Sequence, residues 1–155
     1  MKKIYNSLII VCFITILAGC EQSVKESLNP DSPEFVTKQF YTHLKEGKME
    51  EAYYLLHPDS RKIISKRDFV LDGKIRYPFM YSKIVKISVE PAVIQETWTL
   101  GEVTYHNIAN VPTRINLINY RRYKSKSIKL ISHLGRDKEG KWRIFMMAKP
   151  TNKKK

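Results

Sequence analysis

The sequence is short of cysteine, glycine, proline and acidic residues, and each shortage excludes a class of protein. Two cysteines in 155 residues cannot build a disulfide framework or a four-thiolate zinc site. Six glycines and seven prolines are too few for a low-complexity chain, and a hydrophobic content of 43% is too high for a disordered one. What is present is the length of one globular domain and a basic excess, with 28 Lys and Arg against 15 Asp and Glu.

The first twenty residues have the pattern of a secretion signal. Two lysines precede an apolar run over residues 8–17, which is about half the ~20 residues that a bilayer-spanning helix needs. The run ends in Leu-Ala-Gly-Cys at residues 17–20, an ending that resembles the lipobox of bacterial lipoproteins. The resemblance implies that residues 1–19 are a signal peptide and that Cys20 carries a thioether-linked diacylglycerol. The alternative is an ordinary secretory signal followed by an incidental cysteine.

A lipid on Cys20 would hold the mature chain at the extracytoplasmic face of the cell membrane. Two acyl chains anchor a protein stably, whereas a single chain binds only marginally. Residues 20–31 are polar and predict a flexible tether, residues 32–148 a single domain, and residues 149–155 a basic tail. The expected partners are therefore the membrane, through the anchor at Cys20, and an envelope protein or anionic polymer. Nucleic acid is not an expected partner.

The first part of the domain predicts helices. Ser32-Pro33-Glu34 combines a hydroxyl cap, a proline at the first helical position and an acid near the positive end of the helix dipole. Apolar residues at spacing four then give one face, and Gly47 is expected to end the helix. A second helix is predicted over residues 48–56, where His57-Pro58 ends it and His57 acts as a cap or turn residue. A third helical stretch, residues 60–64 and 66–71, is expected to end before Asp72-Gly73.

The pattern changes to strands at residue 85. Val85, Ile87 and Val89 alternate with polar residues, which is the two-residue period of a half-buried strand. Further strands are predicted at about residues 96–108, 113–124, 127–134 and 141–147, the last two joined by a hairpin turn. Helices followed by an antiparallel meander predict an α+β fold, with N-terminal helices packed on a curved sheet. Six residues are expected to meet in its core: Ile128, Leu130, Leu134, Trp142, Ile144 and Met146.

This order of elements resembles the nuclear transport factor two-like superfamily, a cystatin-like cone that includes ketosteroid isomerase and scytalone dehydratase. The resemblance spans about residues 32–147 and is carried by the runs at 32–36, 52–56, 58–61 and 140–144, the last reading Gly-Lys-Trp-Arg-Ile. It implies a conical cavity between the helices and the sheet. The candidate pocket residues are Phe40, Tyr53, Tyr105, His106 and Trp142.

The sequence gives little support for catalysis. Enzymes of the superfamily place an acid or His inside the cone, opposite a hydrogen-bond donor, but no Asp occurs between Gly73 and Arg136. His133 shares a strand face with Lys129 and is expected to face solvent, whereas His106 could face either way. The four histidines lack the spacing of a metal site, and no phosphate-binding glycine loop or nucleophile elbow is present. The expectation is a protein with no catalytic residues, metal or cofactor, and an isomerase- or dehydratase-type pocket is the alternative.

Basic charge gathers near the C-terminus. Residues 111–155 contain fourteen Lys and Arg against two acids, a net charge of +12. A solvated sheet face explains most of these residues one by one, yet the total exceeds what solubility needs. Anionic membrane surfaces attract such segments, with each basic residue worth about 1 kcal/mol. The candidate contacts to an anionic surface or partner are Arg114, Arg121, Arg122, Lys124, Lys126 and Lys129.

Three functions are compatible with these observations. The first is a membrane-anchored, non-enzymatic accessory module that contacts an envelope protein or an anionic surface. The second is a protein that binds a small molecule or lipid in the cone cavity. The third is an immunity or exclusion lipoprotein. Neither the identity of the partner nor the oligomeric state follows from the sequence.

Overall fold

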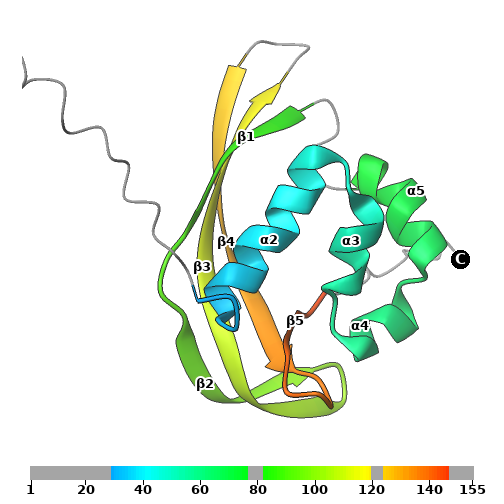
Figure 1. Cartoon of the computed structure of the whole chain (residues 1–155), viewed down its shortest axis with the longest axis vertical. Helices are drawn as coiled ribbons and strands as arrows, with labels where there is room; N and C mark the ends of the chain where they lie inside the picture. Colours follow the sequence, from blue (N-terminus) through cyan, green and yellow to red (C-terminus); the bar gives the residue numbers. More distant parts are fainter. Residues whose placement is uncertain (1–28, 77–81, 120–123, 147–155) are drawn as a thin grey trace, which may run out of the picture.

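The computed structural model describes residues 29–76, 82–119 and 124–146 (Figure 1). Four helices come first: α2 (Pro33–Glu46), α3 (Met49–Tyr54), α4 (Pro58–Ile63) and α5 (Lys66–Arg76). Five strands follow: β1 (Ser82–Val89), β2 (Val93–Leu100), β3 (Val103–Asn119), β4 (Lys124–Arg136) and β5 (Trp142–Ile144). The predicted α+β class with an antiparallel sheet is confirmed. Cys20, Arg121, Arg122 and residues 149–155 lie outside the described residues.

The helix α2 begins and ends where its caps predict. The Ser32 hydroxyl accepts a hydrogen bond from the Phe35 N–H at 3.1 Å, and Pro33 occupies the first turn. Gly47 ends the helix with a φ of 75°, a left-handed conformation that glycine adopts without steric cost. The face between the two caps buries Val36 and Phe40, as their spacing predicts.

The next helices differ from the prediction at their ends. The helix α3 stops at Tyr54, two residues before the predicted end. His57 caps α4 by accepting a hydrogen bond from the Asp59 N–H, so this histidine is a cap residue as expected. The helix α5 runs through Asp72-Gly73 to Arg76, so the predicted stop there is wrong. A glycine inside a helix costs only about 1 kcal/mol relative to alanine, which a helix packed through Phe69 can tolerate.

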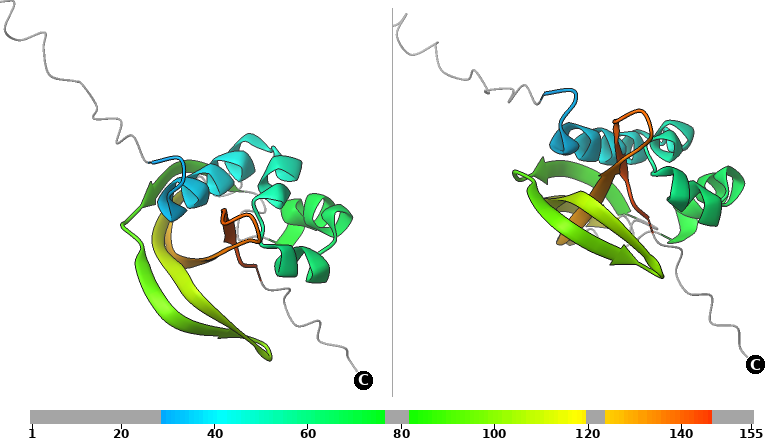
Figure 2. Two further views of the ribbon diagram at one scale, coloured as in Figure 1. Left: turned by 60° about the horizontal axis from the view of Figure 1, so that its bottom comes forward. Right: turned by 90° about the horizontal axis from the view of Figure 1, so that it is seen from below.

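The sheet is organised around β3. This 17-residue strand pairs with β4 along one edge, and with β1 and then β2 along the other. The helices lie on one side of the sheet, and β2 with the first part of β3 curls below β5 (Figure 2). The five strands therefore form one twisted sheet with one covered face and one open face.

Two strand predictions are wrong. The predicted strand over residues 96–108 is a hairpin, in which β2 turns into β3 at Gly101 with a φ of 64°. The turn carries a single glycine and no Asn-Gly or Asp-Gly pair, so the sequence signal for it is weak. In β1 the pairing register shifts between Ile84 and Lys86, which buries Ile84 and leaves Val85 45% exposed instead of inward-facing.

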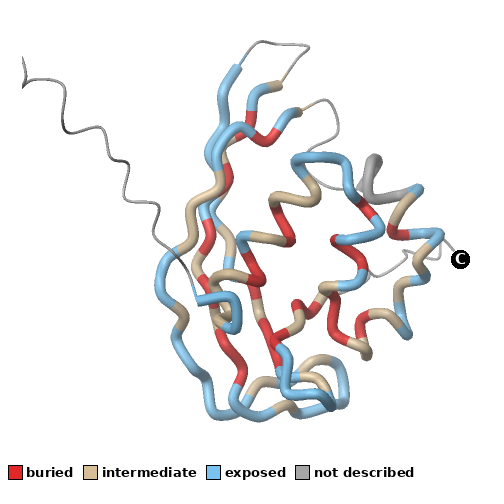
Figure 3. Tube along the Cα trace, viewed as in Figure 1, coloured by how far each residue is buried: buried red, intermediate tan, exposed pale blue. Residues whose placement is uncertain are grey.

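The core lies between the helices and the covered face of the sheet, where buried residues of both layers meet (Figure 3). Two backbone hydrogen bonds join these layers at one point, because Ile144 N–H donates to Leu55 O at 2.9 Å and His57 N–H donates to Ile144 O at 2.7 Å. Leu56, between the two, is fully buried. The prediction of the core residues on the last two strands is confirmed for all six: Ile128, Leu130, Leu134, Trp142, Ile144 and Met146.

Gly135 is required for space rather than for backbone conformation. A Cβ atom at this position would lie 2.7 Å from a Phe145 ring carbon and 3.2 Å from the end of the Ile108 side chain. We expect Gly135→Ala to lower the free energy of unfolding by about 1–3 kcal/mol, the usual cost of overpacking. Urea unfolding measures this cost. The double variant Gly135→Ala/Phe145→Leu should lose less free energy of unfolding than the sum of the two single variants. Strict additivity would show that the Phe145 ring is not what the added methyl group clashes with.

Candidate functional site

The open face of β3 and β4 brings two cations together. Alternate residues of β3, from Ala109 to Leu117, face the helices, so the residues between them face away from the core. On this outer face Arg114 lies directly opposite Lys129 in the β3–β4 register. The neighbouring outer pair is Pro112 opposite Ile131, and the side chain of Ile131 is 57% exposed. The outer face therefore carries a basic pair beside an apolar pair.

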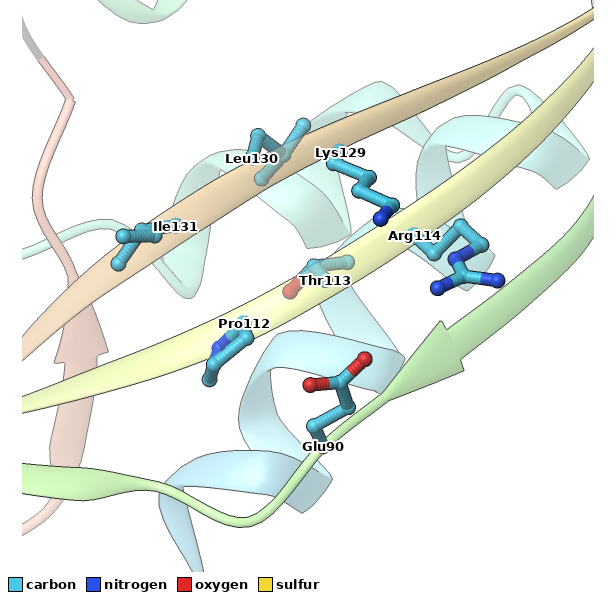
Figure 4. Close-up of a pocket in the computed structure, with 7 residues that line it drawn as sticks. All are labelled: Glu90, Pro112, Thr113, Arg114, Lys129, Leu130 and Ile131. Carbon is cyan, nitrogen blue, oxygen red and sulfur yellow. The ribbon is translucent and has the colours of Figure 1, made fainter.

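These two pairs line a groove of about 260 Å³, shown in Figure 4. Glu90 reaches it from the segment after β1, which is held in place because the Glu90 N–H donates to Pro112 O at 2.9 Å. Lys129 and Arg114 lie along one part of the groove, with Glu90 across from them (Figure 4). The lining residues are Glu90, Pro112, Thr113, Arg114, Lys129, Leu130 and Ile131.

The placement of Arg114 against Lys129 is electrostatically unfavourable. Like charges directly opposite in an antiparallel pair destabilise a sheet. Within residues 29–76, 82–119 and 124–146 neither cation forms an ion pair within 4.0 Å, and this includes Glu90. Local conflicts of this kind concentrate at functional positions. The groove is thus a place where an anionic group would relieve a repulsion already present in the fold.

The other predicted contact residues divide between two surfaces. Lys126 is exposed on β4 but lies opposite Leu117, which places it on the other face of the sheet from Lys129. Lys124 is exposed at the start of β4, opposite Asn119. Arg114 and Lys129 are therefore the two members of the predicted set that the described structure brings together.

The five candidate pocket residues do not line one cavity. Phe40 and Tyr53 are buried around Phe69, with ring centroids 6.4 Å and 5.6 Å from it. Trp142 is buried under Arg136, whose guanidinium lies 4.4 Å from the indole centroid. Tyr105 and His106 lie on the first part of β3, where His106 is exposed.

A second cluster, the aromatic–histidine cluster, fills the space where the β2–β3 hairpin curls below β5. Its members are His57, Trp98, Tyr105, His133 and Phe145. Phe145 stacks on His57 at 4.1 Å between centroids, and Trp98 stacks on His133 at 4.8 Å. Tyr105 lies 4.6 Å from Phe145 and 5.7 Å from His57. His133 lies on the outer face, as predicted. The prediction that it faces solvent is wrong, because Trp98 covers it and leaves it half-buried.

One backbone irregularity makes this cluster possible. Asn107 has a φ of 53°, which is uncommon for a residue other than glycine. Residues 105 and 108 would point to opposite faces of a regular strand, yet Tyr105 and Ile108 both reach the neighbourhood of Phe145. The sequence offered one signal that was missed: once the turn at Gly101 is recognised, Trp98 and Tyr105 become direct cross-strand partners.

The polar groups of the cluster are already engaged with one another. The Tyr105 hydroxyl donates to Asp59 Oδ2 at 3.0 Å, and Lys62 donates to Asp59 Oδ1 at 2.6 Å. His57 Nδ1 accepts the Asp59 N–H at 3.3 Å. His133 Nδ1 lies 2.7 Å from Asn110 Oδ1. These bonds tie α4 and the β2–β3 hairpin together, and they occupy both oxygens of Asp59.

The protonation states follow from these surroundings. Burial lowers the pKa of both His57 and His133, so both rings are neutral at pH 7. The hydrogen bond from Lys62 lowers the pKa of Asp59, which stays ionised, and burial raises the pKa of Tyr105, which keeps its proton. At neutral pH the cluster therefore consists of two uncharged histidines beside one ion pair.

The described residues contain neither a cluster of metal ligands nor a helix that could span a membrane. Across the described part of the chain, no three His, Cys, Asp or Glu side chains gather where they could bind a metal ion. In the same residues no helix is long and apolar enough to span a membrane. No family model matches this sequence, and no curated protein is significantly similar to it.

The lowered histidine pKa values predict a stability that depends on pH. Below about pH 6.5, the ordinary histidine pKa, the unfolded chain binds protons more readily than the folded one. The free energy of unfolding should therefore fall as the pH decreases from about 6.5 toward 5. The lowered pKa values of Asp59 and Asp137 act only below their ordinary value of 3.8, outside this range.

Thermal unfolding at a series of pH values tests this expectation. The variant His57→Gln/His133→Gln should show a much flatter dependence between pH 7 and pH 5 than the unmodified chain. His106→Gln, at an exposed position on the same hairpin, is the matched control and should keep the original slope. An unchanged slope in the double variant would contradict the assignment.

Proposed function

We propose that this chain is a membrane-anchored, extracytoplasmic lipoprotein that acts as a non-enzymatic binding module, and that the outer face of β3 and β4 binds an anionic lipid surface. The observation that most strongly supports the binding of an anionic surface is the pairing of Arg114 with Lys129. Two cations that repel each other in the free protein lose part of that repulsion when an anionic group lies between them.

The surroundings of the two cations favour a lipid surface over a soluble anion. Pro112 and the exposed Ile131 lie beside them, so one face offers both charge and apolar area. The interfacial region of a membrane combines phosphate groups with apolar surface in the same way. A tether over residues 20–31 would span at most roughly 40 Å, which keeps the domain close to the bilayer.

The hydrogen bonds around the aromatic–histidine cluster support binding over catalysis for Asp59 and His57. A general base needs a free lone pair directed at a substrate. Asp59 uses both oxygens on Lys62 and Tyr105, and His57 uses Nδ1 on the α4 backbone. We also infer that the domain belongs to the nuclear transport factor two-like cone, because helices precede an antiparallel sheet that they cover on one face. That inference concerns fold alone.

Vesicle binding tests the lipid surface directly. Residues 20–155 with Cys20→Ser, which carry neither the lipid nor the apolar signal segment, should bind phosphatidylglycerol vesicles and not phosphatidylcholine vesicles, and added salt should weaken the binding. Adding Arg114→Gln and Lys129→Gln should lower the apparent affinity roughly 30-fold, which corresponds to about 1 kcal/mol for each charge. Co-sedimentation over a range of lipid concentrations gives the affinity.

A matched control removes two charges elsewhere. Arg67→Gln/Lys138→Gln changes the net charge equally on α5 and in the β4–β5 turn, where both residues are exposed. It should leave vesicle binding within about twofold of the Cys20→Ser chain. Equal losses of vesicle affinity in both double variants would show that net charge alone explains the binding, and would contradict a site on the outer face. Absence of vesicle binding, with an envelope protein crosslinked to this face, would favour a protein partner instead.

The same substitutions should stabilise the fold. Because Arg114 and Lys129 repel each other, Arg114→Gln is expected to raise the free energy of unfolding by a few tenths of a kcal/mol. Urea unfolding at low salt measures the change, and high salt should diminish it. A loss of stability would show that Arg114 makes a favourable contact in the free protein.

The lipid anchor has its own test. Cys20→Ser should abolish both cleavage of residues 1–19 and the mass increase of a diacylglycerol, because the modified sulfur is absent. Mass spectrometry of the chain extracted from bacterial membranes measures both. Cys12→Ser, within the proposed signal peptide, should change neither.

A further inference from the structure

Among the described residues, four strands of the sheet have an edge to which another strand could add, and three of them are protected. The edge of the three-residue β5 is covered by the segment at Leu55 and His57. Unpaired strand edges invite pairing with other chains, and natural proteins block them with lysines, bulges or covering elements. The strand β1 has the register shift at Val85, where Lys45 of α2 donates to the Val85 carbonyl at 3.2 Å. It also carries Lys83 and Lys86. The strand β4 pairs with β5 only over residues 134–136 and carries Lys124, Lys126 and Lys129 along the rest.

The strand β2 has none of these protections. Among the described residues it pairs with β3 alone. Its register does not shift, although the pairing skips Glu96 and Asn107, where β3 has its positive φ. Its sequence, Val-Ile-Gln-Glu-Thr-Trp-Thr-Leu, is rich in β-branched and aromatic residues, lacks proline and lysine, and has Glu96 as its one charge. Val93 and Ile94 are 63% and 53% exposed, although they point to opposite faces of the strand. An edge of this kind is a site for strand addition.

The charge distribution identifies the partner. No Lys or Arg occurs between Lys86 and Arg114, in a chain that has 28 of them. Two copies with a formal net charge of +13 each repel one another over most of their surface. The segment that contains β2 adds no positive charge to a contact, and its own charges are Glu90, Glu96 and Glu102, so it is the part of the chain where basic residues least oppose the approach of a second copy.

We propose that two copies of this chain form a dimer by antiparallel pairing of β2 with β2. A two-fold axis perpendicular to the sheet relates the copies, so the contact is closed and the two sheets become continuous. Such an axis leaves both outer faces on the same side. The Arg114–Lys129 grooves of the two copies then point in one direction, and a flat anionic surface can engage both at once.

The oligomeric state tests this proposal. The mature lipidated chain in a non-ionic detergent should have twice the protein mass of one copy of residues 20–155 by light scattering coupled to size-exclusion chromatography. Thr97→Lys adds a lysine at an exposed position in the middle of β2 and should give the monomer mass with an unchanged melting temperature. Ser125→Lys adds the same charge at an exposed position of β4 and should leave the dimer intact.

Crosslinking gives a second measurement that does not disturb the edge. The mature chain lacks Cys12, and its Cys20 sulfur carries the lipid. In this chain Glu96→Cys and Thr97→Cys, treated with a short bismaleimide, should give a covalent dimer, whereas Ser125→Cys should not. A monomer mass for the unmodified chain at every concentration, or a Thr97→Lys chain that still dimerises, overturns the proposal. Larger assemblies that Ser125→Lys disrupts also overturn it, since they indicate an open β2–β4 contact.

Discussion

The pairing register of β3 is the constraint on which the rest of the structure depends. Each strand pair other than β4–β5 includes β3, and its inner row of Ala109, Val111, Ile115 and Leu117 is almost fully buried. Successive side chains of a strand point to opposite faces, so a shift of one residue would bury Arg114 and expose this row. The burial of the inner row therefore also fixes Arg114 opposite Lys129. The position of the groove therefore follows from the packing of the core.

The aromatic–histidine cluster and the outer groove differ in whether their charged groups have partners within the protein. The aromatic–histidine cluster satisfies its own charges and hydrogen bonds, and it holds the curled end of the sheet against α4. The outer groove leaves its two cations without a carboxylate partner within the described residues. A self-satisfied cluster stabilises the protein, whereas an unsatisfied pair is available to something outside it.

Local sequence signals predicted the elements that depend on local interactions. The ends of α2 follow from Ser32 and Gly47, since a cap needs only its own neighbours. The hairpin at Gly101 and the bulge at Val85 were missed because pairing with distant strands decides them. The two cations were predicted as members of a basic set, but their direct opposition depends on the β3–β4 register. The aromatic–histidine cluster depends on the positive φ of Asn107, which no residue pattern predicts.

The bonds between Ile144 and the segment at Leu55 and His57 determine when folding can finish. These partners are about ninety residues apart in the chain, with α2 and α3 before them and α4, α5 and β1 to β4 between them. Contacts between distant residues form late, because the intervening chain must first be ordered. Before β5 forms, α2 can already contact β1, but the segment at Leu55 and His57 lacks its strand partner. The segment between α3 and α4 is fixed against the sheet only after β5 has formed, so this contact between the two layers is a late step of folding.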